Sequence, residues 1–163
     1  MEPPLIIDVE ASGLGRGSYP IEVGVAMPDG ATHCMIIRRQ AEWRHWDEHA
    51  ERLHGISREI LEFYGREPDD VATHLNQWLA GRVVYSDAWG NDSSWLGLLF
   101  DCAGIVQQFK LESLRSLLSE RQLQHWHGIK EQVIAASNIR RHRASNDALI
   151  LQKTFCETAK LMS

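Results

Sequence analysis

The spacing of apolar residues changes near residue 47, and this change limits the folds open to the chain. Before it, three apolar runs have the length and composition of strands, at residues 4–9, 20–27 and 31–38. Asp29-Gly30, between the second and third runs, is a strong hairpin signal. These residues therefore predict an antiparallel meander at one edge of a sheet.

After residue 47, apolar side chains recur mostly at helical spacing. Helices are expected over about 53–64, from Pro68 to Gly81, over 93–102, over 114–122, and from an N-cap at Asn146 to the end. Strands are expected at 83–85 and 109–114. Three strands followed by helices and two further strands predict a mixed α/β sheet with helices packed on it.

Length, charge and cysteine content favour one soluble domain spanning residues 1–163. Three widely spaced cysteines without a CxxC pair indicate reduced, mostly buried thiols. Neither a signal peptide nor a membrane span is visible. A cytoplasmic protein is therefore expected. The net charge of −5 argues mildly against a nucleic-acid partner. Carboxylates clustered in a site can account for most of this charge. Without four such acids, the net charge of −5 would be −1.

Asp8 and Glu10 stand two residues apart at the end of the first apolar run. A strand places both side chains on one face, where two carboxylates are costly unless a positive charge meets them. Mg²⁺ and Mn²⁺ prefer such oxygen ligands. By itself the DxE pattern is weak, and taken alone it is better explained by a solvated strand end.

His142 and Asp147 form a second candidate pair near the C-terminus. Five residues turn an α-helix by about 140° beyond a full turn, so the two side chains cannot share a helical face. His142 is therefore expected in a loop, with Asp147 in the first turn of the following helix. The alternatives are an acid that favours the helix dipole and a histidine in a solvated basic run.

Together these segments resemble the DEDDh exonucleases, the DnaQ-like group of the ribonuclease-H-like superfamily. Asp8 and Glu10 match the family's first motif, and HxAxxD at 142–147 matches the third. Asp92 fits the second motif by its distance to Trp95 and Leu96, although Asp87 remains the alternative. LHGIS at 53–57 is similar to a segment that many members carry between the sheet edge and a helix.

The resemblance implies a ribonuclease-H-like fold with a mixed five-stranded sheet and helices on both faces. It implies two divalent cations, Mg²⁺ or Mn²⁺, held by Asp8, Glu10, Asp92 and Asp147, with His142 as the general base. Substrate contacts are implied for the following residues: Ser12, Gly13, Leu14, His54, Ile56 and Arg143.

The implied activity is 3′→5′ hydrolysis of single-stranded nucleic acid to 5′-mononucleotides, with RNA favoured over DNA. The alternatives are an inactive nucleic-acid-binding module and a phosphodiesterase acting on dinucleotides or small nucleotides. A homodimer is a further expectation, through the segment around Trp43 and Trp46 or through Trp126.

Overall fold

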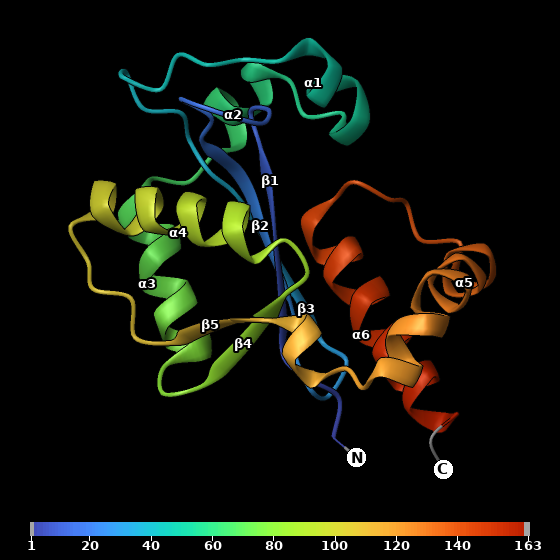
Figure 1. Ribbon diagram of the computed structural model, residues 1–163. Coiled ribbons are helices and arrows are strands. Elements are labelled where there is room, and N and C mark those ends of the chain that lie inside the picture. Colours follow the sequence, from blue (N-terminus) through green and yellow to red (C-terminus); the bar gives the residue numbers. More distant parts are fainter. Residues whose placement is uncertain (1, 162–163) are drawn as a thin grey trace.

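The sheet of the computed structural model, which describes residues 2–161, contains five strands (Figure 1). They are β1 (Ile6–Ala11), β2 (Pro20–Ala26), β3 (Thr32–Ile36), β4 (Val83–Ser86) and β5 (Lys110–Ser113). Their order is β3-β2-β1-β4-β5, in which β1, β2 and β3 pair antiparallel while β4 is parallel to both β1 and β5. The sequence prediction of a mixed five-stranded sheet is confirmed.

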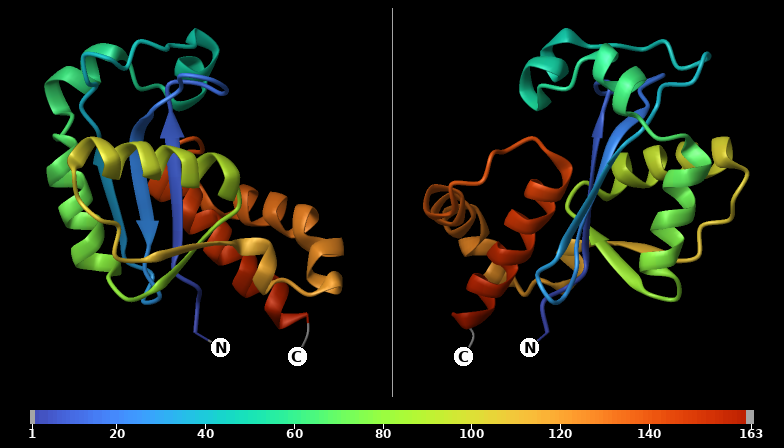
Figure 2. Two further views of the ribbon diagram at one scale, coloured as in Figure 1. Left: turned by 60° about the vertical axis from the view of Figure 1, so that its left-hand side comes forward. Right: turned by 180° about the vertical axis from the view of Figure 1, so that it is seen from behind.

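Helices cover both faces of this sheet (Figures 1 and 2). α3 (Pro68–Leu79) and α4 (Trp89–Ala103) lie on one face, and α5 (Glu120–Ser137) and α6 (Ala144–Lys160) lie on the other. α1 (Glu48–His54) and α2 (Arg58–Tyr64) lie beyond the end toward which β1 points. A short 3-10 helix, η1 (Leu114–Leu117), follows β5. Within residues 2–161, none of the helices is long and apolar enough to cross a membrane.

Alternation along β1 divides the apolar core into two parts. Ile7 and Val9 belong to the larger part, on the side of α3 and α4. Ile6 belongs to the smaller part, with Ala148 and Leu151 of α6. Since residues two apart share a face, Asp8 and Glu10 continue the face that begins with Ile6 and meets α6.

Gly24 allows α6 to lie directly on the sheet. It pairs with Asp8 in the β1–β2 register. A Cβ atom at this position would lie 2.0 Å from the backbone nitrogen of Ser145 and 2.3 Å from the carbonyl carbon of Ala144. Any side chain there would push the first turn of α6 away from the strand, so Gly24 determines how closely α6 approaches Asp8.

Several helix boundaries differ from those expected. α4 begins at Trp89, four residues early, and the residues expected to form one helix at 114–122 are divided between η1 and α5. α6 begins at Ala144 with Arg143 at its N-cap position and no side-chain cap; the expected cap residue, Asn146, lies in the first turn and donates to the carbonyl of Arg140. The expectation of mostly buried thiols is wrong, since Cys34 and Cys102 are both exposed.

Candidate metal centre

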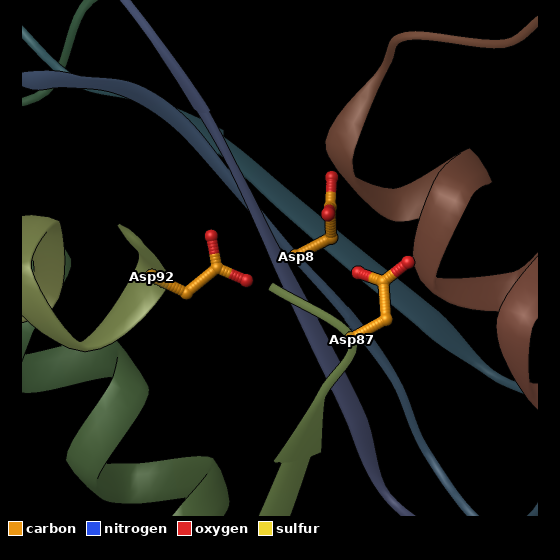
Figure 3. A group of neighbouring side chains, drawn as sticks. All are labelled: Asp8, Asp87 and Asp92. Carbon is orange, nitrogen blue, oxygen red and sulfur yellow. The ribbon is translucent and has the colours of Figure 1, made fainter. Parts of the chain in front are cut away.

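Four carboxylates surround the carboxylate of Asp8 of β1. Asp8 forms one group with Asp87 and Asp92 (Figure 3) and a second group with Glu10 and Asp147. Within each group, one carboxylate oxygen from every residue lies within 4.8 Å of the others. The predicted acids are therefore brought together from three separate parts of the chain, and Asp87 joins them.

The parallel pairing of β1 with β4 explains why Asp87 and Asp92 reach Asp8. Ile6 pairs with Tyr85, so the chain leaving β4 emerges beside the second half of β1. Asp92 lies in the first turn of α4, is 1% exposed, and extends toward β1 (Figure 3). The buried hydroxyl of Ser86, at the end of β4, donates a hydrogen bond to the Asp92 carboxylate. Ser86 was not predicted from the sequence, because a serine at a strand end carries no distinctive signal.

His142 and Asp147 lie in the segments expected for them. Asp147 is in the first turn of α6, and His142 is in the preceding loop with a positive φ of 61°. The backbone N–H of His142 donates to both oxygens of the Asp147 carboxylate, at 3.1 Å each. A left-handed backbone is uncommon outside glycine, and this contact stabilises it.

Glu22 of β2 anchors the same loop, a role that was not predicted from the sequence. Its carboxylate is fully buried beside Glu10 in the β1–β2 register. It accepts hydrogen bonds from Nε and Nη2 of Arg143, the latter at 2.5 Å, and from the backbone N–H of Ala144 at 2.7 Å. This carboxylate thus satisfies the first N–H of α6. The available signal was an acid inside an otherwise apolar strand.

The Glu22 contact also bears on Arg143, for which a substrate contact was expected. The guanidinium is occupied by Glu22, and the side chain is 32% exposed. Its observed contact therefore holds the loop that carries His142, and any contact with substrate stays a prediction.

Burial and mutual repulsion raise the pKa values of the clustered acids. Burial is the largest cause for Asp8, whose pKa lies well above its usual value, with Asp92 and Glu10 adding repulsion. Burial and then the charge of Asp147 raise the pKa of Glu10 to about 8. Burial raises the pKa of Asp92 to about 7 against the opposing hydrogen bond from Ser86. Burial also raises the pKa of Asp147.

Clustered acids of this kind fit divalent cations. Every candidate ligand atom is a carboxylate oxygen, the donor that Mg²⁺ and Mn²⁺ prefer. Bound cations would favour the charged carboxylates that burial and repulsion disfavour. Asp8 is common to both groups, which makes it the residue able to bridge two ions.

A cavity of about 220 Å³ borders the carboxylates on the side of α1. Glu10 and His142 line one part of it, and Gly13, Leu14 and His54 line another. Leu14 is 71% exposed, whereas His54 is buried and its Nδ1 accepts the N–H of Ile56. Within residues 2–161, the Nε2 atom of His54 has no hydrogen-bond partner. This cavity offers apolar and polar contacts beside the candidate metal ligands.

Gly13 lets the chain after β1 pass close to the segment before α1. A Cβ at Gly13 would lie 2.7 Å from Cβ of Asp47 and 2.7 Å from Cε1 of His45. The hydroxyl of Ser12 lies 2.9 Å from Nδ1 of His45 and accepts the N–H of Tyr19 at 3.1 Å. These contacts fix the wall of the cavity on this side.

Burial bears on three of the contacts expected for individual side chains. Ser12 is fully buried and uses its hydroxyl within the fold, so it is not open to a substrate. Ile56 is 1% exposed and packs in the larger core, which supports ordinary packing over contact with a base. Trp43 is buried and stacks on Tyr19, with ring centroids 5.3 Å apart, so its ring is used within the fold, while a dimer contact through the segment around Trp43 and Trp46 stays a prediction.

Solved structures share this architecture. The structure of S. pombe Pop2p with Mg²⁺ and Mn²⁺ bound aligns with a TM-score of 0.68 at 15% identity, covering 96% of this chain and 82% of that one. An E. coli exonuclease I complex with single-stranded DNA, in its zinc-bound form, aligns with a TM-score of 0.70 at 11% identity. That alignment covers 99% of this chain and 41% of exonuclease I.

A moderately thermophilic exonuclease I from Methylocaldum szegediense aligns with a TM-score of 0.59 at 11% identity, over 77% of this chain and 30% of that one. No protein-family model matches the sequence, and no curated protein matches it. The chain spans less than half the length of the exonuclease I structures. These comparisons, together with the mixed sheet between two helical layers, show that the chain has the ribonuclease-H-like exonuclease fold.

Proposed function

We propose that the protein is a metal-dependent 3′→5′ exonuclease of the DEDDh type that releases 5′-mononucleotides. The observation that carries this proposal is the sharing of Asp8 between two groups of carboxylates. Two Mg²⁺ or Mn²⁺ ions bound there would clamp the attacking and leaving oxygens of an in-line displacement at phosphorus. Structures with the same fold include exonuclease I bound to single-stranded DNA and Pop2p with Mg²⁺ and Mn²⁺ bound.

Cation binding and proton transfer are carried out by different residues of this chain. Asp8, Glu10, Asp92 and Asp147 hold the cations. The His142 side chain, at the border of the cavity and the carboxylates, takes a proton from the attacking water. An imidazole with a pKa ordinarily near 6.5 suits this role close to neutral pH.

The cavity beside Glu10 receives the 3′-terminal nucleoside. Leu14 projects from its rim with most of its surface exposed, in position to pack against the terminal base. His54 and Gly13 line the interior. A terminal nucleotide reaches this cavity by leaving the stack, which costs a few kcal/mol per base in a duplex and much less in a single strand.

The substrate is therefore single-stranded nucleic acid or a frayed 3′ end. RNA is favoured over DNA on the family resemblance. Rates on a single strand, a 3′ overhang and a blunt duplex, compared at fixed salt, should fall in that order. Equal rates on all three would contradict the argument from unstacking.

The decisive experiment uses 5′-labelled single-stranded RNA and DNA with Mn²⁺. Progressive shortening of the labelled strand and release of 5′-mononucleotides are expected, and EDTA should abolish both. Asp8→Asn should be inactive, while Asp101→Asn, an exposed acid on α4, should behave as wild type. Activity that survives chelation, or internal cuts in a strand, would overturn the proposal.

A phosphodiesterase acting on dinucleotides is the second candidate. The cavity of about 220 Å³ is compatible with it, since a dinucleotide would also place one nucleoside there. Single-turnover rates on dinucleotides and on longer strands separate the two functions. A rate on dinucleotides far above that on longer strands would favour the second candidate.

A homodimer is a separate part of the proposal. Trp126 of α5 packs partly against the smaller core and keeps some surface exposed, so it can meet a second copy. Light scattering at micromolar concentration tests this expectation, and a monomeric mass would remove it.

A further inference from the structure

A second cavity borders the carboxylates and shares none of its lining residues with the nucleoside cavity. Its volume is about 120 Å³, roughly half that of the first, which suits a phosphate group better than a nucleoside. Three acids and two basic residues line it, with two apolar residues of α6: Asp8, Asp87, Asp147, Lys130, Arg141, Ile150 and Leu151. Glu10 and His142 line the first cavity instead, so the carboxylates separate two distinct spaces.

Lys130 reaches this second cavity from α5. Its side chain is 23% exposed, and its ammonium lies 3.7 Å from the Asp87 carboxylate. The same carboxylate belongs to the group formed with Asp8 and Asp92. Asp87 therefore holds the ammonium beside the candidate metal centre, and the remaining N–H donors of Lys130 are available to an anion.

Arg141 lines the same cavity from the loop before α6. Although three acids share the cavity, the guanidinium makes no hydrogen bond or ion pair within the described part of the chain. Its five N–H donors can thus meet phosphate oxygens, which match the planar fork of an arginine.

The charge balance of the loaded site favours an anion in this cavity. Two divalent cations carry four positive charges against the five clustered carboxylates. With the positive charges of Lys130 and Arg141 added, the sum over cations, carboxylates and basic side chains is positive, and both basic side chains lie at the second cavity. A phosphodiester is the anion that a nucleic-acid strand would present at this point.

We propose that Lys130 and Arg141 form a subsite for the phosphodiester on the 5′ side of the scissile one. This inference rests on the proposed function, which puts the terminal nucleoside in the first cavity and the scissile phosphate at the carboxylates. The preceding nucleotide then continues past the carboxylates, where the second cavity lies. Asp87 acts as a positioning residue for Lys130.

Two short substrates test this subsite directly. A dinucleoside monophosphate contains the scissile phosphodiester alone, whereas a trinucleoside diphosphate adds the phosphodiester on its 5′ side. With Mn²⁺, Lys130→Gln and Arg141→Gln should each lower kcat/KM for the longer compound by roughly tenfold or more, mainly through KM. The loss on the shorter compound should stay below about twofold, because its missing phosphate leaves no contact to lose.

Control variants separate phosphate binding from a structural role. Lys130→Arg should keep the preference for the longer compound, and Lys153→Gln, on the exposed side of α6 away from the carboxylates, should leave both rates unchanged. On longer strands, Lys130→Gln should reduce the slope of log affinity against log salt by about 0.7, the value for one phosphate contact on a single strand. Equal losses on both short compounds would overturn the subsite.

Binding without turnover distinguishes failure of the subsite from failure of the proposed function. Fluorescence polarisation compares the two labelled compounds on His142→Ala protein with Mn²⁺, with and without Lys130→Gln. Weaker binding of the longer compound alone supports the subsite even where no hydrolysis is seen. The subsite is contradicted if His142→Ala protein binds both compounds equally, or if Lys130→Gln weakens the binding of both equally. Neither result bears on the proposed function, which is tested by hydrolysis with the wild-type protein.

Discussion

The backbone N–H of His142 donates to both carboxylate oxygens of Asp147. This contact connects the candidate general base to a candidate metal ligand through the backbone rather than through the imidazole. The side chain of His142 is therefore free to face the cavity, while its backbone keeps Asp147 in place. The two roles can be separated by mutation.

His142→Ala should lower kcat by roughly 10²–10⁴, the usual span for loss of a general acid–base group. The backbone N–H remains in this variant, so Asp147 keeps its hydrogen bond and the thermal shift caused by Mn²⁺ should persist. Single-turnover kinetics and thermal melts measure the two effects, with His125→Ala on the exposed side of α5 as the control. Loss of the Mn²⁺ shift in His142→Ala would contradict this separation.

Divalent cations should raise the melting temperature of the protein. A ligand at 100 times its dissociation constant adds about 2.7 kcal/mol, which corresponds to roughly 5–10 °C for a chain of this size. Asp8→Asn should abolish the shift because Asp8 belongs to both carboxylate groups. In EDTA this variant should melt higher than wild type, because burial and then repulsion by neighbouring acids disfavour the charged Asp8 carboxylate. A normal Mn²⁺ shift in Asp8→Asn would count against the metal centre.

The two acids after β4 should differ in their effect on cation binding. Asp92 is buried and accepts a hydrogen bond from Ser86, whereas Asp87 is exposed and paired with Lys130. Asp92→Asn should remove most of the Mn²⁺ shift and of the hydrolysis, and Asp87→Asn should reduce both much less. The reverse order in titrations with Mn²⁺ would assign the second-motif ligand to Asp87.

The free energy of unfolding in EDTA should fall as pH rises from about 4.5 to about 8. Burial and neighbouring charges raise the pKa of Glu10 to about 8 in the folded protein, so over this range the folded state binds more protons than the unfolded state. The stabilisation from protonated Glu10 is present below the unfolded pKa and is lost as pH passes the folded one.

Urea denaturation across this pH range measures the effect. Glu10→Gln should flatten the slope, whereas Glu131→Gln, an exposed acid on α5, should leave it unchanged. Cation binding should strengthen over the same range, because the ligands must lose their protons. An unchanged slope in Glu10→Gln would contradict the raised pKa.

Glu22→Gln should destabilise the protein by about 2–3 kcal/mol, since charge-assisted hydrogen bonds from Arg143 and Ala144 are weakened inside the protein. Activity should also fall, because these contacts anchor the loop that carries His142. The matched control is Glu157→Gln, which breaks an exposed pair with Lys160 and should cost at most about 1 kcal/mol. Equal losses in the two variants, measured by urea denaturation, would show that Glu22 does not anchor the loop.

Local periodicity was sufficient to predict much of the site. A period of two put Asp8 and Glu10 on one face of a strand, and a period of 3.6 separated His142 from Asp147. Both placements are observed, because each depends on residues within a few positions of one another. The same reasoning located the meander and the strand before Asp92.

Long-range packing decided what local patterns could not. Glu22 meets Ala144 across 122 residues, and Gly24 is needed because α6 lies against it, so neither role can be read from neighbouring residues. Ile56, Ser12 and Leu14 were all expected to contact substrate. In the structure Ile56 and Ser12 are buried, whereas Leu14 is exposed. Residue types, and the strand or helix faces that carry them, follow from local patterns in the chain. Which of these side chains meet at Asp8 depends instead on how closely elements distant in the chain can pack.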